Sequence, residues 1–282
     1  MSSIVNEIKQ KVVGTSTPQG QHLAALLTSK GSALERDLGF FIASYPAIPG
    51  SDVAGIVISA GSSVPTDAPK PGTRVPAFAP CFFVQGAPDY GALQTRVLVP
   101  AVKTVELPEG MAFNEASLLP MAVVTAWSGW YPIGLPRDTS YTAPGKQGML
   151  VWGGASSISS AAIQVAKMMG FKVYTTASEK HHEYLKELGA SKTFYYKDER
   201  VVENIIKAAK VDGVTIDNGF DAVGQLPSSV EILKALKGEK TAKLASATHI
   251  PEDTPKVEGV EAKFVAAPLD ERERTEFFSF RF

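Results

Sequence analysis

The fold is decided by residues 151–159, which read Val151-Trp152-Gly153-Gly154-Ala155-Ser156-Ser157-Ile158-Ser159. An apolar strand here runs through small residues directly into the start of a helix. Unpaired backbone N–H groups and the positive end of the helix dipole therefore meet at one point, which suits a pyrophosphate. The stretch indicates a dinucleotide-binding loop, with a plain small-residue turn of an α/β sheet as the alternative.

The loop departs from the strict glycine fingerprint of dinucleotide sites. Starting from Gly154, the second and third glycine positions of G-x-G-x-x-G hold Ser156 and Ser159. Serine still allows close backbone approach and adds a hydroxyl donor, so the fingerprint survives in a degenerate form. The cofactor-binding candidates of this loop are Gly154, Ala155, Ser156, Ser157 and Ile158.

Strand-like and helix-like segments alternate along the second half of the chain. The predicted strands lie at 149–152, 172–176, 193–196, 219–223, 243–247 and 262–266, and the predicted helices at 156–169, 179–188, 199–209 and 228–236. Apolar residues recur at helical spacing in 156–169, and Gly170 follows that helix. The alternation predicts an α/β class fold, a doubly wound parallel sheet of the Rossmann type with helices on its faces.

The preceding region, about 45–105, has a different character. Prolines and glycines come often there, and short runs rich in Val and Ile lie between them. This pattern predicts a small, irregular β unit with many turns. Its predicted strands lie at 53–59, 73–77 and 92–99.

The end of the predicted strand 172–176 bears on the choice of cofactor. An NAD-specific site places an Asp or Glu at this strand end to accept from the ribose 2′-hydroxyl. Here Ala177 and Ser178 follow the strand, and Glu179 comes one residue later. Ser178 and Lys180 offer a hydroxyl and a cation to a 2′-phosphate, which favours NADPH. The alternative is that Ser178 caps a helix and Lys180 and His181 are solvated on its first turn.

Composition excludes several classes of protein. The 282 residues contain 28 Lys and Arg against 29 Asp and Glu, a net charge of −1, so no general attraction to nucleic acid or a membrane surface is expected. The single cysteine, Cys81, excludes an intramolecular disulfide framework and zinc sites built from several thiolates. The first ten residues carry charges where a signal peptide needs an apolar stretch, so the predicted location is the cytoplasm.

The N-terminal and C-terminal segments of the chain have weaker secondary-structure patterns than the middle. Short amphipathic stretches at 4–12 and 23–26 lack clear capping residues. The last residues carry four aromatics that are expected to dock on another surface, namely Phe277, Phe278, Phe280 and Phe282.

The chain resembles the medium-chain dehydrogenase/reductase superfamily, in its zinc-independent quinone reductase and enoyl reductase branch. The residues that carry the resemblance are 45–55 (YPAIPGSDVAG), 71–75 (PGTRV), 91–94 (GALQ), 118–120 (LLP), 151–160 and Tyr196. They occur in the order and spacing of the superfamily, over about 36–268. Fungal members of the branch include trans-acting enoyl reductases that serve polyketide synthases.

The resemblance implies a GroES-like β domain followed by a Rossmann domain, with the active site between them. It implies that 155–158 contact the pyrophosphate, that Ser178, Glu179, Lys180, His181 and Tyr196 contact the adenosine and its 2′-phosphate, and that Ala247, Thr248 and Thr125 lie near the nicotinamide. Zinc-dependent relatives have Gly-His-Glu where this chain has Gly50-Ser51-Asp52. Since Ser51 cannot replace an imidazole, no metal site is expected.

The resemblance also predicts the division of the chain. The predicted parts are an atypical segment 1–35, an incomplete GroES-like domain 36–128, a Rossmann domain 129–268 and a shortened tail 269–282. Members of the superfamily carry an Asn-Pro-x-Asp-Trp loop near their N-terminus and continue well past the position of Phe282. The chain is therefore expected to lack pieces at both ends.

The predicted function is NADPH-dependent hydride transfer to an activated C=C or C=O of an enone, a quinone or an enoyl thioester that is free or carrier-bound. Hydride leaves the nicotinamide, and a proton follows from solvent or a tyrosine. Thr125, Tyr90 and Tyr131 are candidate donors, although packing is the more frequent role of a tyrosine. The alternative from another class is an inactive nucleotide-binding remnant that acts as an interaction protein. A homodimer is among the expected assemblies.

Overall fold

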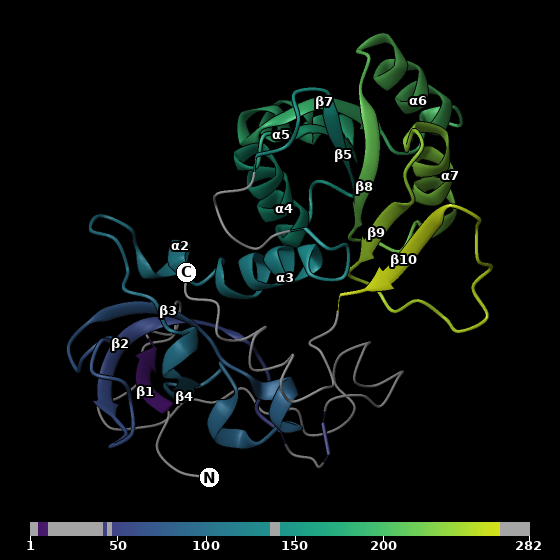
Figure 1. Cartoon of the computed structure of the whole chain (residues 1–282). Helices are drawn as coiled ribbons and strands as arrows, with labels where there is room; N and C mark the ends of the chain where they lie inside the picture. The colour runs from purple at the N-terminus through teal and green to yellow at the C-terminus, as the bar shows by residue number, and fades with distance from the viewer. Residues whose placement is uncertain (1–4, 11–41, 44–46, 136–141, 266–282) are drawn as a thin grey trace. The chain divides into compact units, whose positions relative to one another are not determined.

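A computed structural model describes residues 5–10, 42–43, 47–135 and 142–265 (Figure 1). Contacts divide the chain into two compact units, one containing the described residues up to Met121 and the other those from Ala122 onward. Each unit has its own sheet and its own buried core. The aromatic residues at 277–282 and the stretch 23–26 lie outside the described residues.

The second unit contains a six-stranded sheet in which every neighbouring pair is parallel. Its strands are β5 (Gln147–Trp152), β6 (Lys172–Ala177), β7 (Ala190–Tyr195), β8 (Thr215–Asp221), β9 (Ala242–Ser246) and β10 (Val260–Phe264). Their spatial order is β10-β9-β8-β5-β6-β7. With β5 counted as the first strand this is the order 6-5-4-1-2-3, which defines a Rossmann fold and confirms the predicted class.

Helices cover both faces of this sheet (Figure 1). They are α4 (Ser157–Met168) and α5 (His182–Leu188) on one face and α6 (Val201–Val211) and α7 (Leu226–Leu236) on the other. The side chains of β5 alternate between the faces: Met149 and Val151 pack in the core with α4, and Leu150 and Trp152 pack with α6 and α7. Every residue of β5 is buried, as expected for a central parallel strand.

The predicted helix 179–188 is one element in the sequence and two in the structure. A short 3₁₀ turn, η4 (Glu179–His181), precedes α5, and the Ser178 side chain makes no capping hydrogen bond. The prediction of a continuous helix starting at Glu179 is therefore wrong, because the first turn winds more tightly than an α-helix. Gly189 ends α5 with a φ of 119°, a conformation that favours glycine.

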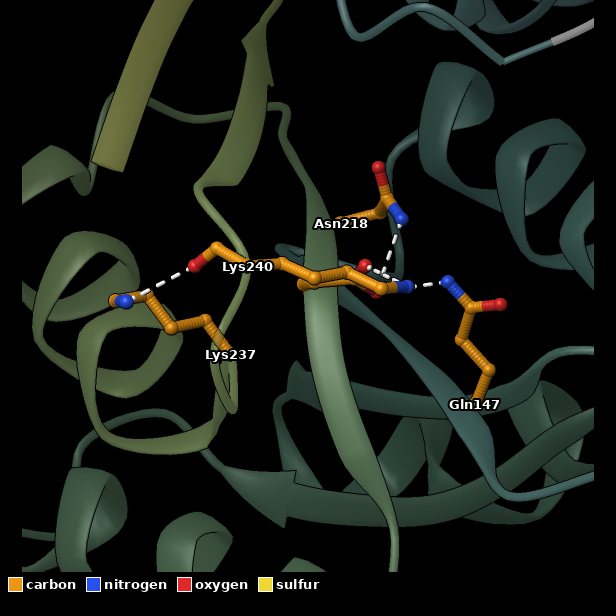
Figure 2. Close-up of polar contacts among 5 residues, drawn as sticks. Gln147, Asn218, Lys237 and Lys240 are labelled. Carbon is orange, nitrogen blue, oxygen red and sulfur yellow. Dashed lines mark hydrogen bonds and ion pairs between the residues drawn. The ribbon is translucent and has the colours of Figure 1, made fainter. Parts of the chain in front are cut away.

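The amino-terminal side of the parallel sheet holds a polar network around Asp217 of β8 (Figure 2). The carboxylate accepts hydrogen bonds from Gln147 Nε2 at 2.7 Å and Asn218 Nδ2 at 3.1 Å. Lys240 Nζ lies 2.7 Å from the other carboxylate oxygen, and Lys237 Nζ donates to the Lys240 carbonyl at 2.9 Å. The network ties β5, β8 and the segment before β9 together.

The first unit is built on a four-stranded antiparallel sheet of order β3-β2-β1-β4. Its strands are β1 (Val5–Gln10), β2 (Asp52–Ala60), β3 (Arg74–Phe78) and β4 (Arg96–Pro100). The amphipathic stretch predicted at 4–12 contains β1, which pairs with both β2 and β4. Three 3₁₀ turns lie in this unit as well, η1 (Cys81–Val84), η2 (Pro88–Tyr90) and η3 (Ala101–Lys103).

The predicted strand 92–99 is wrong in its first half, since β4 begins only at Arg96. The amides of Ala92 and Leu93 instead donate to the carbonyls of Gly50 and Pro49, each at 3.0 Å. The backbone approaches so closely that a Cβ on Gly91 would lie 2.0 Å from the Ile48 carbonyl oxygen. This tight packing against another segment takes the place of a strand pairing.

Two helices follow the antiparallel sheet, α2 (Phe113–Ala116) and α3 (Pro120–Trp130). α3 contains the point between Met121 and Ala122 at which contacts divide the chain. In the second unit, the Trp130 ring packs edge-on against Phe220 with centroids 6.0 Å apart. Within the described residues, no helix combines the length and the apolar character needed to cross a membrane.

Candidate functional site

A cavity of about 540 Å³ lies where four strands of the parallel sheet end. Its lining lies at or just past the ends of four strands, namely β5 (Trp152, Gly153, Ala155, Ser156), β6 (Thr176, Ala177, Ser178), β7 (Tyr196, Lys197) and β8 (Val223, Gln225). The strand order changes direction between β5 and β8, and ligands of open α/β sheets bind outside the carboxyl ends at that point. The cavity is therefore in the place where this fold binds nucleotides.

Two consecutive glycines lie at and beneath its floor. Gly153 has a φ of 80°, and a Cβ on it would lie 2.8 Å from Val223 Cγ1. A Cβ on Gly154 would lie 2.2 Å from Thr175 Oγ1, whose hydroxyl donates to the Val151 carbonyl at 2.7 Å. Both positions thus require glycine, one for its backbone conformation and one for close packing between β5 and β6. Gly153 lines the cavity, whereas Gly154 is buried beneath it.

The N-terminus of α4 supplies hydrogen-bond donors at this point. Ser156 caps the helix, and its Oγ accepts from the Ser159 amide at 3.1 Å. Among the described residues, nothing accepts from the amides of Ala155, Ser157 or Ile158. Ala155 and Ser156 line the cavity, and Ser157 and Ile158 lie on the first turn behind them. Unpaired amides and a helix dipole together form an anion site.

The end of β6 is held against the glycine loop by the side chain and the backbone of Thr176. The Gly153 amide donates to Thr176 Oγ1 at 3.0 Å, and the Gly154 amide donates to the Thr176 carbonyl at 2.8 Å. Ser178 follows and lines the cavity. The next three predicted cofactor residues, Glu179, Lys180 and His181, form the 3₁₀ turn and lie outside the lining.

The end of β7 brings a cation to the cavity. The Tyr196 amide donates to the Ala177 carbonyl at 3.2 Å, so the two strand ends stay together. Lys197 lines the cavity beside Tyr196, with its Nζ 5.6 Å from the Tyr196 ring centroid. Sequence reasoning selected Tyr196 and missed Lys197. The available signal was its position, since a residue just past a parallel strand end faces the ligand edge of the sheet.

The loop after β8 is shaped by a buried acid. Asp221 is fully buried, and its Oδ1 accepts from the amides of Val223 and Gly224, each at 3.0 Å. Burial raises the pKa of this carboxyl above its ordinary value, although the backbone hydrogen bonds oppose the shift. Asp221 thereby positions Val223 and Gln225, two lining residues that sequence reasoning also missed.

The predicted residues Ala247 and Thr248 follow β9 and lie outside the lining. The Ala247 amide donates to the Asp221 carbonyl at 2.8 Å, and Thr248 exchanges hydrogen bonds with the Ser246 hydroxyl. A Cβ on Gly224 would lie 3.1 Å from Thr248 Oγ1. The pair therefore packs directly against the β8 loop.

The two catalytic candidates belong to different units. Thr125 is half-buried on α3 and falls in the second unit. Tyr90 is half-buried at the end of η2 in the first unit.

The residues at the metal position of zinc-dependent relatives make other contacts. The Ser51 hydroxyl is buried, and Asp52 Oδ1 accepts from the Met121 amide at 2.5 Å. Burial raises the pKa of Asp52 above its ordinary value. The Cys81 thiol donates to the Ile48 carbonyl at 3.2 Å. Within the described residues, no group of three His, Cys, Asp or Glu side chains is placed to hold a metal ion.

These features define a class of protein. A parallel sheet of Rossmann order with a glycine loop and a capped helix N-terminus at its switch point is a dinucleotide-binding unit. Here it is joined in one chain to a smaller unit with an antiparallel sheet.

Comparison with known proteins identifies the family. Residues 24–109 match the alcohol dehydrogenase GroES-like domain, and residues 157–246 match the family described as zinc-binding dehydrogenase. The trans-enoyl reductase tazE of Aspergillus terreus is 41% identical over 275 residues, covering 94% of this chain and 91% of that protein. The trans-enoyl reductase tndF of Aspergillus flavipes is 41% identical over 243 residues, covering 86% of this chain and 70% of that protein.

The fold has relatives among solved structures as well. Quinone oxidoreductase of Escherichia coli, crystallised with NADPH, has a TM-score of 0.63 at 19% identity and covers 98% of this chain and 77% of its own. The chain belongs to the medium-chain dehydrogenase/reductase superfamily of oxidoreductases and is enoyl-reductase-like within it.

Proposed function

We propose that the protein is an NADPH-dependent reductase that transfers hydride to an activated C=C or C=O without a catalytic metal. The observation that carries the proposal is the cavity at the carboxyl ends of β5 to β8, which combines an anion-binding helix N-terminus with Lys197 and contains no Asp or Glu in its described lining. A nucleotide with several phosphates matches these charges.

The residues of the cavity fit such a nucleotide. The amides of Ala155 and Ser157 are the donors we propose for the pyrophosphate. The absence of a side chain at Gly153 allows the phosphates to approach the loop backbone closely. A side chain at this position would collide with Val223. Ser178, Tyr196 and Lys197 line the part of the cavity formed by β6 and β7, where an adenosine 2′-phosphate would need donors. When bound, NADPH supplies the hydride, and the protein supplies binding and orientation.

Metal-free catalysis is supported by the contacts at the position of the zinc ligands in relatives. Ser51 offers neither a nitrogen nor a thiolate as a zinc ligand. The Cys81 thiol donates a hydrogen bond, which a metal-bound thiolate cannot do. Negative charge that develops on the substrate then needs hydrogen-bond donors. Thr125 and Tyr90 are the donors we propose for this role.

The names of the relatives suggest the substrate class. Two curated relatives at 41% identity are called trans-enoyl reductases, and a structural relative is called a quinone oxidoreductase. We infer that the substrate is an enone, a quinone or an enoyl thioester, free or bound to a carrier. Because the net charge is −1, we propose that the protein acts without nucleic acid or membrane partners. The proposed location is the cytoplasm, and the proposed assembly is a homodimer.

The test is NADPH oxidation with enones, quinones and enoyl thioesters, compared with an Ala155→Asp variant. A carboxylate at Ala155 would face the pyrophosphate, so we expect turnover by the native chain and at least about a tenfold loss in the variant. The matched control is Ala60→Asp, an exposed position at the end of β2. NADPH binding without turnover on any substrate would instead favour a nucleotide-binding interaction protein.

A further inference from the structure

Lys103 ends the 3₁₀ turn η3 in the first unit, and its side chain lies against two aromatic rings. Its Nζ atom lies 4.6 Å from the ring centroid of Phe78 and 5.4 Å from that of Phe83. The two rings meet edge to face, with centroids 5.8 Å apart. Lys103 is half-buried in this position, whereas a lysine ordinarily extends its ammonium into water.

The turn that carries Phe83 is held in place by its own hydrogen bonds. The Phe83 amide donates to the Pro80 carbonyl at 2.9 Å, and the buried Cys81 thiol donates to the Ile48 carbonyl at 3.2 Å. Phe78 belongs to β3 and is 2% exposed, whereas Phe83 is 55% exposed. The amine of Lys103 therefore contacts one buried ring and one solvent-facing ring.

Burial changes the acid–base chemistry of this amine. Removal of water disfavours the ammonium form and lowers the pKa of Lys103 from its ordinary value of 10.5 to about 8, and attraction to the ring faces opposes the shift. At pH 7 a pKa near this value leaves about one tenth of the side chain as the neutral, nucleophilic amine.

The elements that supply the rings carry two other titratable side chains, Arg74 on β3 and Cys81 on η1. The Arg74 guanidinium donates to the Met111 carbonyl at 2.7 Å and lies 4.7 Å from the Phe113 ring centroid. The Cys81 thiol is protonated, since it donates a hydrogen bond. Neither group therefore supplies a negative charge that would favour the ammonium form of Lys103.

We propose that Lys103 is a modification site at which small acyl thioesters transfer their acyl group to Nζ. The neutral amine attacks the thioester carbonyl carbon, so that a C–N bond forms and the C–S bond breaks. The sulfur leaves as a thiol with the proton that the nitrogen releases, and Lys103 becomes an uncharged amide. The exposed Phe83 ring gives the acyl chain an apolar surface beside the amine. Because the reaction uses no residue of the nucleotide cavity, the inference is independent of the proposed reductase function.

The experiment incubates the full chain with S-acetyl-N-acetylcysteamine, a small thioester, over a range of about pH 6 to about pH 9.5. Peptide mass spectrometry measures the initial rate of acetylation at Lys103 and at Lys70, an exposed lysine of the same unit. At about pH 7.5 we expect the rate at Lys103 to be about tenfold higher, because a desolvated lysine is the more activated nucleophile. The rate at Lys103 should level off once the pH exceeds the lowered pKa of its amine.

Two arginine variants assign the signal while keeping the charge. Lys103→Arg should remove one acetyl group per chain from the fast phase, and Lys70→Arg should leave the rate at Lys103 unchanged. Circular dichroism checks that both variants are folded. If Lys103→Arg does not fold, the native chain still decides, because the rates are measured peptide by peptide.

Two outcomes would overturn the inference. Acetylation of Lys103 that is no faster than that of Lys70 would show that the rings only anchor the ammonium. A rate at Lys103 that still rises about tenfold per pH unit near pH 9 would show that burial does not activate the amine. Oxidation of NADPH is a separate measurement, so the failure of either proposal leaves the other standing.

Discussion

The two ends of the parallel sheet each present a lysine, and the two lysines have opposite surroundings. At the amino-terminal side, Lys240 Nζ lies 2.7 Å from Asp217, which is itself buried and bonded to Gln147 and Asn218 (Figure 2). At the carboxyl side, Lys197 lines a cavity without an acidic neighbour in its lining.

The difference separates structural charge from functional charge. A carboxylate whose two oxygens already accept hydrogen bonds holds strands together and is not available to a ligand. A cation that shares its cavity with free amides and a helix N-terminus is placed for an anion from solution. Changes at the amino-terminal side should therefore alter stability alone, and changes at the carboxyl side should alter binding as well.

The largest effect is expected from Gly154→Ala at the carboxyl side. Its Cβ would lie 2.2 Å from Thr175 Oγ1, a buried atom held by the Val151 carbonyl, so strands β5 and β6 must separate. We expect about 3 kcal/mol of lost free energy of unfolding, together with loss of NADPH binding. Chemical denaturation and calorimetry measure the two. Gly145→Ala is the matched control, because nothing lies within 4 Å of its Cβ. Unchanged stability would contradict the packing role.

A smaller effect is expected from Asp217→Ala at the amino-terminal side. The buried amide groups of Gln147 and Asn218 lose their acceptor, which predicts a loss of about 2 kcal/mol in the free energy of unfolding. NADPH affinity should stay at the native value.

The control for this change is Lys240→Ala. Its side chain is 65% exposed, so an expected loss below about 1 kcal/mol distinguishes the buried hydrogen bonds from the ion pair. A change in the NADPH dissociation constant of either variant would contradict the claim that the amino-terminal side of the sheet affects stability alone.

The smallest effect concerns the titration of Asp221 under the β8 loop. Burial raises the pKa of Asp221 in the folded chain, so the folded state binds this proton more tightly than the unfolded state does. Stability should therefore fall as the pH rises from the ordinary value of 3.8 through the raised pKa.

Asp221→Asn removes this titration and keeps an acceptor for the Val223 and Gly224 amides. Urea unfolding at a series of pH values measures the free energy of unfolding of both proteins. Across that pH interval the value for the variant should rise relative to the native value, and above the interval the difference should stay constant. Asp253→Asn, an exposed carboxylate, is the control for charge alone. A constant difference at all pH values would contradict the assignment.

Much of the second unit could be predicted from the sequence. The segment 151–159 correctly indicated a strand, a turn and a helix, because small residues between an apolar run and a Ser cap have few other uses. Alternation of strands and helices likewise predicted a parallel sheet. Each of these is a local pattern, readable over ten to twenty residues.

The differences arise where distant segments meet. The first half of the predicted strand at 92–99 is not a strand, because the Ala92 and Leu93 amides donate hydrogen bonds to Gly50 and Pro49, which lie far away in sequence. Lys197 was missed in favour of Lys180 for a similar reason. Both lysines lie near a serine or a tyrosine in sequence, and only the pairing of β6 with β7 shows which one reaches the cavity.

The sequence by itself determined the Rossmann class of this protein, the place of its glycine loop and the absence of an acid at the end of β6, since these depend on local residue types and spacing. Tertiary structure alone decided which lysine is paired with Asp217 and which lines the nucleotide cavity. The reason is physical: a charge interacts over a few ångströms in space, and those neighbours come from strands that are adjacent only in the folded sheet.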